Sequence, residues 1–188
     1  MSQYKIYILL TDTGTLLGRT IKQYTKAPYN HASIAFDKEL DEMYSFGRKQ
    51  PRNPLNGGFV KEDVINGTFK YFPKTTCALY ELEITDRQLK RMNRVINQFK
   101  KNQESYNYNI LGLIGVALKG PIEREGSYFC SQFVSEVLNR SGIRLFDKPP
   151  SLVTPDDLRN LEKLRLIYEG ALYEYEPVKI KLKEKYVS

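Results

Sequence analysis

The chain has 188 residues, of which 41% are hydrophobic and 12% aromatic, which excludes wholesale disorder and suits a single domain over residues 1–188. Met1–Leu10 carries no signal-peptide pattern, and the longest apolar run, Ile110–Leu118, is about half of the roughly 20 residues that span a bilayer. We therefore expect a cytoplasmic protein in which Cys77 and Cys130 are free thiols.

The formal net charge of +7 is concentrated in two basic segments, a predicted helix over Asp86–Asn102 and the tail from Val178. Such segments attract anionic lipid, nucleic acid or an acidic substrate, although a solvated basic face is the commoner explanation. Because no stacking-aromatic motif accompanies the charge, we expect no specific nucleic acid partner. An anionic membrane surface stays open as an alternative partner.

Mostly strands are predicted in the N-terminal third of the chain. Apolar runs and alternation indicate strands at Tyr4–Leu10, Ala32–Phe36 and Glu42–Phe46. Apolar residues at helical spacing predict a helix over Thr15–Thr25. Prolines, glycines and basic residues in Gly47–Gly58 are typical of a surface loop.

The rest of the chain mixes strands and helices, which favours a fold with both α and β structure. A capping box at Thr85 begins one helix, and Gly142 is suited to end another. In chain order, the predicted elements are strands at Phe69–Phe72 and Cys77–Ile84, helices at Asp86–Asn102 and from Cys130 to Gly142, a short helix after Thr154, and a hairpin of Leu164–Tyr168 with Leu172–Tyr175.

Cys130 stands where a helical pattern begins, within the segment YFCSQF. A thiol at a helix N-terminus meets the positive end of the macrodipole and several unpaired N–H groups. Both favour the thiolate, and they can bring a cysteine pKa of about 8.5 toward neutrality. The same N–H groups can bind the oxyanion that forms when a thiolate attacks a carbonyl. A small buried hydrophobe is the commoner role of a lone cysteine at such a position.

His31 is the only histidine, and it opens the strand HASIAF directly after a turn. An imidazole at the start of a strand can reach a helix end in a neighbouring layer and act as the base for a cysteine. A third polar group would then orient the ring. Ser45 and Glu42 are candidates if the strand Glu42–Phe46 forms a hairpin with the histidine strand, and Glu62 in GGFVKED is another.

Two other binding motifs fail on their spacing. The segment Gly14–Thr20 follows a strand as a phosphate-binding loop would, but it lacks the lysine and the glycine spacing of that motif. One histidine and two widely separated cysteines provide no closely spaced zinc ligands. We therefore expect no cofactor and no metal.

The arrangement resembles the circularly permuted branch of the NlpC/P60 superfamily of papain-like enzymes, notably its YiiX/YaeF-like members and, more distantly, the lecithin–retinol acyltransferase-like proteins. As in that branch, His31 precedes Cys130. The resemblance covers about half of the chain. It is carried by YILLTDTGTLLGRTIKQYTKAPYNHASIAFD, YNYNILGLIG, YFCSQFVSEVLNRSGI and VTPDDL.

The resemblance implies an α+β fold of the permuted papain-like type, with a curved antiparallel sheet packed against the cysteine helix. It implies Cys130 as nucleophile, His31 as general base and a third polar residue on the following strand, where Ser45 is the best match. Members of the family often have glutamate at that place, and a serine offers no charge to the imidazolium. The implied activity is that of a thiol hydrolase or acyltransferase, such as a cysteine amidase or peptidase, on a peptide, another amide or an ester.

Two other functions remain open at this stage. A lipid-directed acyltransferase or lipase at an anionic membrane keeps the same dyad and uses the basic segments. A non-catalytic binding module on the same fold is the other, and a serine in place of a carboxylate is its main support.

Overall fold

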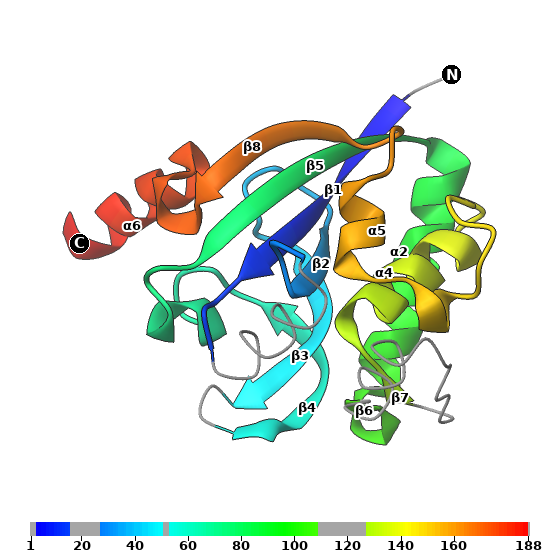
Figure 1. Cartoon of the computed structure of the whole chain (residues 1–188), viewed down its shortest axis with the longest axis horizontal. Helices are drawn as coiled ribbons and strands as arrows, with labels where there is room; N and C mark the ends of the chain where they lie inside the picture. Colours follow the sequence, from blue (N-terminus) through cyan, green and yellow to red (C-terminus); the bar gives the residue numbers. More distant parts are fainter. Residues whose placement is uncertain (1–2, 16–26, 51–52, 109–126, 188) are drawn as a thin grey trace.

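The computed structural model describes residues 3–15, 27–50, 53–108 and 127–187 (Figure 1). Within them, six strands form one sheet in the order β4-β3-β2-β1-β5-β8, and every neighbouring pair is antiparallel. The strands are β1 (Gln3–Asp12), β2 (His31–Ala35), β3 (Met43–Gln50), β4 (Asn53–Glu62), β5 (Thr76–Thr85) and β8 (Arg165–Ala171). The expected α+β class with an antiparallel sheet is confirmed.

Four α-helices and four short 3₁₀ turns complete the described part of the chain. Among the residues described, no helix combines the length and the apolar character needed to cross a membrane. The α-helices are α2 (Asp86–Lys101), α4 (Cys130–Arg140), α5 (Pro155–Arg159) and α6 (Glu176–Val187). The 3₁₀ turns are η1 (Thr68–Tyr71), η2 (Gln103–Ser105), η3 (Pro150–Leu152) and η4 (Leu172–Glu174), and β6 (Asn107–Tyr108) and β7 (Ser127–Tyr128) form a small parallel pair.

The central strand β1 is apolar from Ile6 to Leu10 because both faces of the sheet are covered there. Ile6 and Ile8 belong to a core cluster that includes side chains of α2 and α4. Tyr7 and Leu9, which alternate with them, belong to a second cluster that contains Leu172 from η4. A strand buried on both faces reads as a continuous apolar run, which explains why the first strand was readily predicted.

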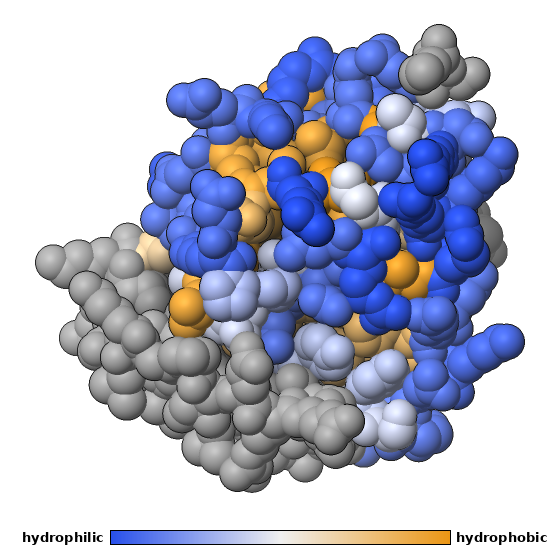
Figure 2. Space-filling model, turned by 90° about the vertical axis from the view of Figure 1, so that its right-hand side faces the viewer, coloured by the Kyte–Doolittle hydropathy of each residue, from blue (hydrophilic) through white to orange (hydrophobic). Residues whose placement is uncertain are grey.

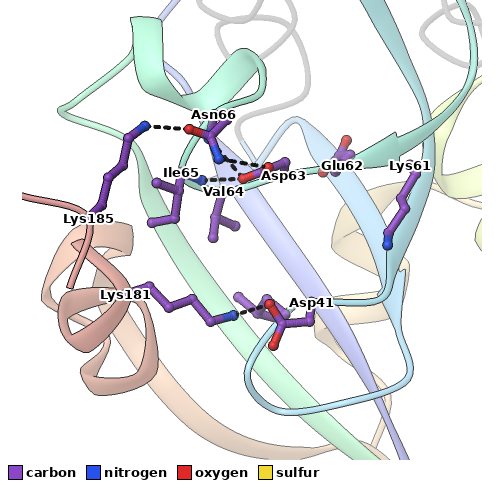
Figure 3. A pocket seen from close by; sticks show the side chains of 10 residues that line it. Asp41, Lys61, Glu62, Asp63, Val64, Ile65, Asn66, Lys181 and Lys185 are labelled. Carbon is purple, nitrogen blue, oxygen red and sulfur yellow. Dashed lines mark hydrogen bonds and ion pairs between the residues drawn. The ribbon is translucent and has the colours of Figure 1, made fainter. Parts of the chain in front are cut away.

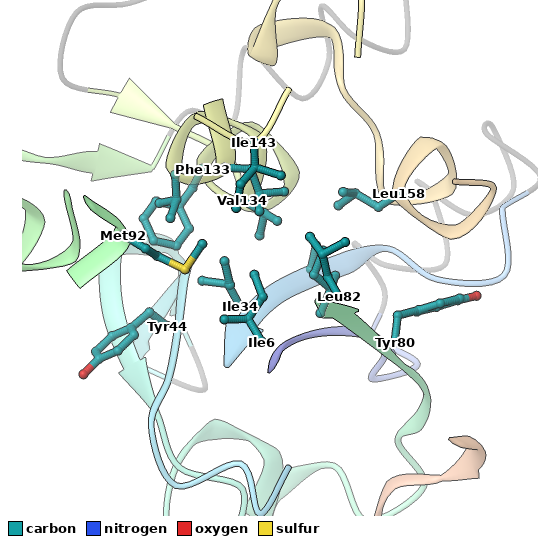
Figure 4. Packing of buried hydrophobic residues seen from close by; sticks show 14 of the residues in the cluster. Ile6, Ile34, Tyr44, Tyr80, Leu82, Met92, Phe133, Val134, Ile143 and Leu158 are labelled. Carbon is teal, nitrogen blue, oxygen red and sulfur yellow. The ribbon is translucent and has the colours of Figure 1, made fainter. Parts of the chain in front are cut away.

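The cluster under α2 and α4 is rich in aromatic rings. Phe46 of β3 lies with its ring centroid 5.0 Å from that of Tyr128 and 5.3 Å from that of Phe133. The ring of Phe99 in α2 packs at 5.9 Å from Phe46 and stacks on Phe59 at 5.7 Å. Figure 4 shows side chains of α2, α4 and the sheet converging on this layer. The apolar face of the cysteine helix α4 therefore holds it against the sheet. This is the packing of helix on sheet that was expected.

The prediction of a surface loop over Gly47–Gly58 was wrong, because this segment forms most of the β3–β4 hairpin. The register pairs Ser45 with Val60 and Gly47 with Gly58, and it shifts between Arg48 and Gln50. Glycines and prolines lower strand propensity locally, but the aromatic residues of both strands bury in the core and hold the ladder together. This correction matters for the site, since β4 ends at Glu62.

Three other predicted elements differ from the structure or fall outside it. Phe69–Phe72 was predicted as a strand, but η1 occupies the segment and buries Phe69 in the second cluster. The predicted closing hairpin is one strand, β8, which pairs with β5 and is followed by η4 and α6. The predicted helix Thr15–Thr25 lies almost entirely outside the described residues.

We expect Phe46→Ala to lower the free energy of unfolding by about 3–5 kcal/mol, because it removes a fully buried ring from an aromatic cluster that cannot close around the cavity. Urea unfolding checks this value. Tyr71→Ala is the control, since Tyr71 is 56% exposed and its loss should change stability by no more than about 0.5 kcal/mol. Equal effects of the two substitutions would contradict the description of this core.

Candidate active site

Cys130 is the first residue of α4, as predicted for a thiol at a helix N-terminus. The helix has Phe129 at its N-cap position and no side-chain cap, so no hydroxyl or carboxylate of the N-cap residue competes for its first N–H groups. The Gln132 side chain instead accepts a hydrogen bond from the Phe129 N–H at 3.4 Å. Ser131 donates to the Val153 carbonyl at 2.7 Å and anchors the beginning of the helix.

Asn30 links the cysteine to the histidine strand. Its backbone N–H donates to the Thr11 carbonyl at 3.1 Å, and its side-chain amide donates to Asp12 Oδ1 at 2.9 Å. These bonds hold the start of β2 against the end of β1. The Asn30 carbonyl in turn accepts a hydrogen bond from Cys130 Sγ at 3.9 Å, so the thiol lies beside the residue that precedes His31.

His31 lies where β2 and β3 no longer share hydrogen bonds. The described pairing of these strands consists of Ile34 with Tyr44 and Ala35 with Met43. Extending that register by three residues places His31 opposite Gly47, and a Cβ atom built on Gly47 would lie 3.5 Å from His31 Cε1. Helix α4 packs against both strands, so the imidazole and the thiol approach each other at this end of β2.

Glu62, the last residue of β4, supplies the carboxylate that contacts the imidazole. Its Oε1 lies 2.8 Å from His31 Nε2 and accepts a hydrogen bond of 2.5 Å from Ser45 Oγ. Its Oε2 accepts a hydrogen bond of 3.0 Å from Ser33 Oγ. Three strands, β2, β3 and β4, thus bring one imidazole, two hydroxyls and one carboxylate together.

This geometry determines which ring nitrogen faces the thiol. An ionised carboxylate only accepts hydrogen bonds, so His31 Nε2 carries its proton toward Glu62, and Nδ1 is the nitrogen that remains for Cys130. Burial by itself would lower the pKa of His31, but the Glu62 charge and hydrogen bonds to Cys130 and Glu62 raise it to about 10. Burial would likewise raise the pKa of the Glu62 carboxyl, but His31, Ser45 and Ser33 hold it below its usual value.

The structure brings four of the five sequence candidates together. Cys130 and His31 are adjacent, and Glu62, which the sequence offered only as one alternative, makes the direct contact with the imidazole. Ser45 contacts the Glu62 carboxylate rather than being the main partner of His31. Glu42 lies apart, because its carboxylate accepts from the Tyr44 hydroxyl at 2.8 Å and lies 3.7 Å from Lys100 Nζ.

Ser33 was missed by the sequence analysis, although the strand pattern contains a signal for it. In HASIA, Ala32 and Ile34 join the aromatic cluster, so His31 and Ser33 must share the other face. A serine on the same face as a candidate base and two residues away from it is placed to contact the base or its partner. Ser33 Oγ lies 3.4 Å from His31 Nε2 as well as within hydrogen-bonding distance of Glu62.

The thiol is shielded from solvent, whereas the imidazole is partly accessible. Cys130 is fully buried, and the side chains of His31 and Glu62 are 18% and 10% exposed. A cleft of about 660 Å³ between α6 and the end of β4 includes Glu62 in its lining but neither Cys130 nor His31 (Figure 3). The Lys181–Asp41 ion pair lies in this cleft. The cleft therefore adjoins the carboxylate and not the thiol.

The donor set of the site does not suit a metal ion. One thiol, one imidazole and one carboxylate are present, but the imidazole separates the other two groups. Among the residues that the structure describes, no group of three histidine, cysteine, aspartate or glutamate side chains is arranged to hold a metal. Cys77, the second cysteine, is a free buried thiol whose pKa is raised to about 12, chiefly by burial and further by the charge of Glu169.

Comparison with known proteins finds no protein-family model that matches this sequence. No curated protein matches it either. A functional assignment therefore depends on the geometry of the site.

The raised pKa of His31 predicts a pH dependence of stability. Because the pKa of about 10 in the folded state lies above the ordinary 6.5, the stabilisation is complete below about pH 6.5 and is lost as the pH rises through 10. Wild type should therefore lose stability relative to His31→Gln over this range, by at most about 1.4 kcal/mol per pH unit. Unfolding in urea at several pH values measures this difference, and a constant difference from pH 6.5 to 10 would contradict the ion pair.

Proposed function

We propose that the chain is a cysteine hydrolase or acyltransferase that acts on an amide or ester through a thioester on Cys130. The observation that carries the proposal is the chain of contacts from the Cys130 thiol through the His31 imidazole to the Glu62 carboxylate. Nucleophile, base and orienting group are the components of covalent catalysis by cysteine. They come from separate parts of the sequence, and hydrophobic packing alone gives no reason for them to converge.

In the reactive state, the proton of the Cys130 thiol resides on Nδ1 of His31, and the resulting imidazolium donates from Nε2 to Glu62, which is consistent with the raised pKa of His31. The thiolate then attacks the substrate carbonyl carbon, a C–S bond forms, and the carbonyl electron pair moves to oxygen. The N–H groups in the first turn of α4 are placed to stabilise that oxyanion, because they have no acceptor within the helix.

In the second step, the tetrahedral intermediate collapses and the bond to the leaving nitrogen or oxygen breaks. His31 Nδ1 returns its proton to the leaving group, which departs as a neutral amine or alcohol. Water or another acceptor then gives a proton to Nδ1 and attacks the thioester, and the Cys130 thiolate is released. Glu62 stabilises the imidazolium at each stage where the ring is doubly protonated.

We also propose that the fold is the circularly permuted papain-like fold of the NlpC/P60 superfamily. Three features support this assignment. The histidine strand precedes the cysteine helix in the chain, the helix packs against an antiparallel sheet, and the thiol lies at the helix N-terminus. The carboxylate on β4 is a departure from the expected third residue on the strand that follows the histidine strand.

Cys130 should react with iodoacetamide much faster than Cys77. Both thiols are buried, with exposed fractions of 0% and 1%, so a difference in rate reports the chemical environment and not exposure alone. We expect Cys130 to be modified even at pH 6.5, where an ordinary thiol of pKa about 8.5 is almost wholly protonated. Mass spectrometry of the labelled peptides measures both rates in one sample.

His31→Gln should abolish the reaction of Cys130 at pH 6.5 and leave that of Cys77 unchanged, whereas Cys77→Ala should leave the Cys130 rate unchanged. Cys130→Ala should remove any amidase or esterase activity. If Cys130 reacts as slowly as Cys77, or reacts only as the pH approaches 8.5, the catalytic proposal is wrong. A non-catalytic binding module would then be the better explanation of this site.

A lipid ester at an anionic membrane is the second candidate substrate. The observation that favours it is the exposed side of α2, which carries basic side chains while its apolar residues are buried in the core. Its basic residues are Arg87, Lys90, Arg91, Arg94, Lys100 and Lys101, against Asp86 as the one acid of the helix. Figure 2 shows the side of the molecule that carries α2 and α4, on which hydrophilic residues dominate among those described.

If this surface binds membrane, the protein should sediment with phosphatidylserine-containing vesicles at low salt and be released at high salt. Arg87→Glu/Lys101→Glu should weaken binding at least about tenfold, because each basic residue near such a surface contributes roughly 1 kcal/mol. Lys70→Glu/Lys74→Glu changes the net charge equally in the segment before β5 and should have a smaller effect. No binding to anionic vesicles at low salt would exclude the lipid candidate.

A further inference from the structure

We infer that Ser33 and Ser45 are positioning residues, which act on His31 by holding the Glu62 carboxylate in one orientation. This inference rests on the proposed function, in which His31 is the base for Cys130. It assigns a role to Ser45 that differs from that of a third catalytic residue. It also adds Ser33, a residue that no sequence motif singled out.

The carboxylate of Glu62 accepts three hydrogen bonds from three different side chains. Oε1 receives His31 Nε2 at 2.8 Å and Ser45 Oγ at 2.5 Å, and Oε2 receives Ser33 Oγ at 3.0 Å. Because both oxygens are engaged, the carboxylate cannot rotate about its terminal bond without losing a hydrogen bond. The two serines therefore determine which oxygen faces the imidazole and from what direction.

Because the Ser33 and Ser45 hydroxyls are buried, each requires a hydrogen-bond acceptor within the protein, and the Glu62 carboxylate provides it. Ser33 and Ser45 are both fully buried, and an unpaired hydroxyl in such a place costs free energy. Their neighbours on the same face, Ala35 and Met43, are apolar and belong to the second core cluster. Each of these serines donates a hydrogen bond to Glu62. Among the described residues, the one other polar contact of either hydroxyl is the longer approach of Ser33 to His31. The bond to Glu62 therefore explains why serine stands at both positions.

Gly47 leaves the space that this arrangement requires. A Cβ atom at position 47 would lie 3.1 Å from Ser45 Oγ, and 3.5 Å from both Glu62 Oε1 and His31 Cε1. Any side chain there would press on the hydroxyl that contacts Oε1. Gly47, two residues after Ser45 on β3, therefore helps to keep Ser45 in position to donate to Glu62.

Loss of either hydroxyl should weaken the hold of Glu62 on the imidazolium. Ser45→Ala should have the larger effect, because Ser45 makes the shorter bond and shares Oε1 with His31. Ser33→Ala removes the bond to the other oxygen and should act in the same direction. Gly47→Ala keeps both hydroxyls but crowds one of them, so it too should weaken the contact.

The sole histidine makes a direct measurement straightforward. With ¹⁵N-labelled histidine, the ring nitrogen shifts report the tautomer and the titration midpoint of His31 without assignment work and without a substrate. Wild type should show both ring nitrogens protonated at neutral pH, a midpoint well above 6.5, and the Nε2–H tautomer above that midpoint. Ser45→Ala should lower the midpoint by about 0.5–1 pH unit, and Ser33→Ala by less.

Ser135→Ala is the matched control. Ser135 is a buried serine of α4 whose hydroxyl has no hydrogen-bond partner among the described residues, so its loss should leave the His31 midpoint unchanged. In a Glu62→Gln background, Ser45→Ala should shift the midpoint by less than half of its effect in wild type, since the serine acts through the carboxylate. Circular dichroism identifies any variant that does not fold, and Ser33→Ala and Gly47→Ala provide independent tests in that case.

Unchanged midpoints in folded Ser45→Ala and Ser33→Ala, within about 0.2 pH unit of wild type, would overturn the inference. An equal shift from Ser45→Ala in the presence and absence of Glu62 would overturn it as well. Failure of the proposed function is distinguishable, because it concerns the alkylation of Cys130. The serines can control the imidazole in a protein whose thiol proves unreactive, and a reactive thiol can coexist with serines that have no effect.

Discussion

The ion pair between Glu62 and His31 is the interaction on which the rest of the site depends. A buried imidazole loses hydration and would be neutral without a nearby negative charge, while a buried carboxylate loses hydration in the same way. Each group makes the charged form of the other favourable, and the 2.8 Å contact directs Nε2 of the ring toward the carboxylate. Nδ1 is thus the ring nitrogen left to face Cys130, and in the proposed mechanism it is the nitrogen that exchanges a proton with the thiol.

The sheet supplies the support for this pair. Hairpin β3–β4 delivers Glu62 from one side, and β2 delivers His31 and Ser33 from the other. Beyond Ile34 and Tyr44 the described ladder between β2 and β3 ends, so side chains instead of backbone bonds connect the strands there. The aromatic cluster on the opposite face holds the strands and α4 in register, which lets a polar site exist within an otherwise apolar interior.

Burial of the thiol has a chemical consequence. Around a fully buried Cys130, charge interactions are stronger than in water, so the contact with His31 has more influence on the thiol than it would at the surface. In the proposed reaction, the same burial requires a substrate to approach from the partly exposed side of His31 or to displace groups that cover the sulfur. The cleft next to Glu62 does not provide that approach, because its lining excludes both residues.

The sequence by itself determined the α+β class, the first strands, the α2 helix with its cap, and the pairing of a helix-opening Cys130 with the sole histidine. The class, the strands and the helix depend on periodicity and capping, which are local properties, whereas the Cys130–His31 pairing came from the single histidine and the family resemblance. The sequence could not decide whether Ser45, Glu42 or Glu62 is the partner of His31. The glycines and prolines of β4 made the strand that carries Glu62 resemble a surface loop. Only the tertiary structure decided that choice and revealed Ser33, since contacts between three strands depend on register and on the layers that cover the sheet.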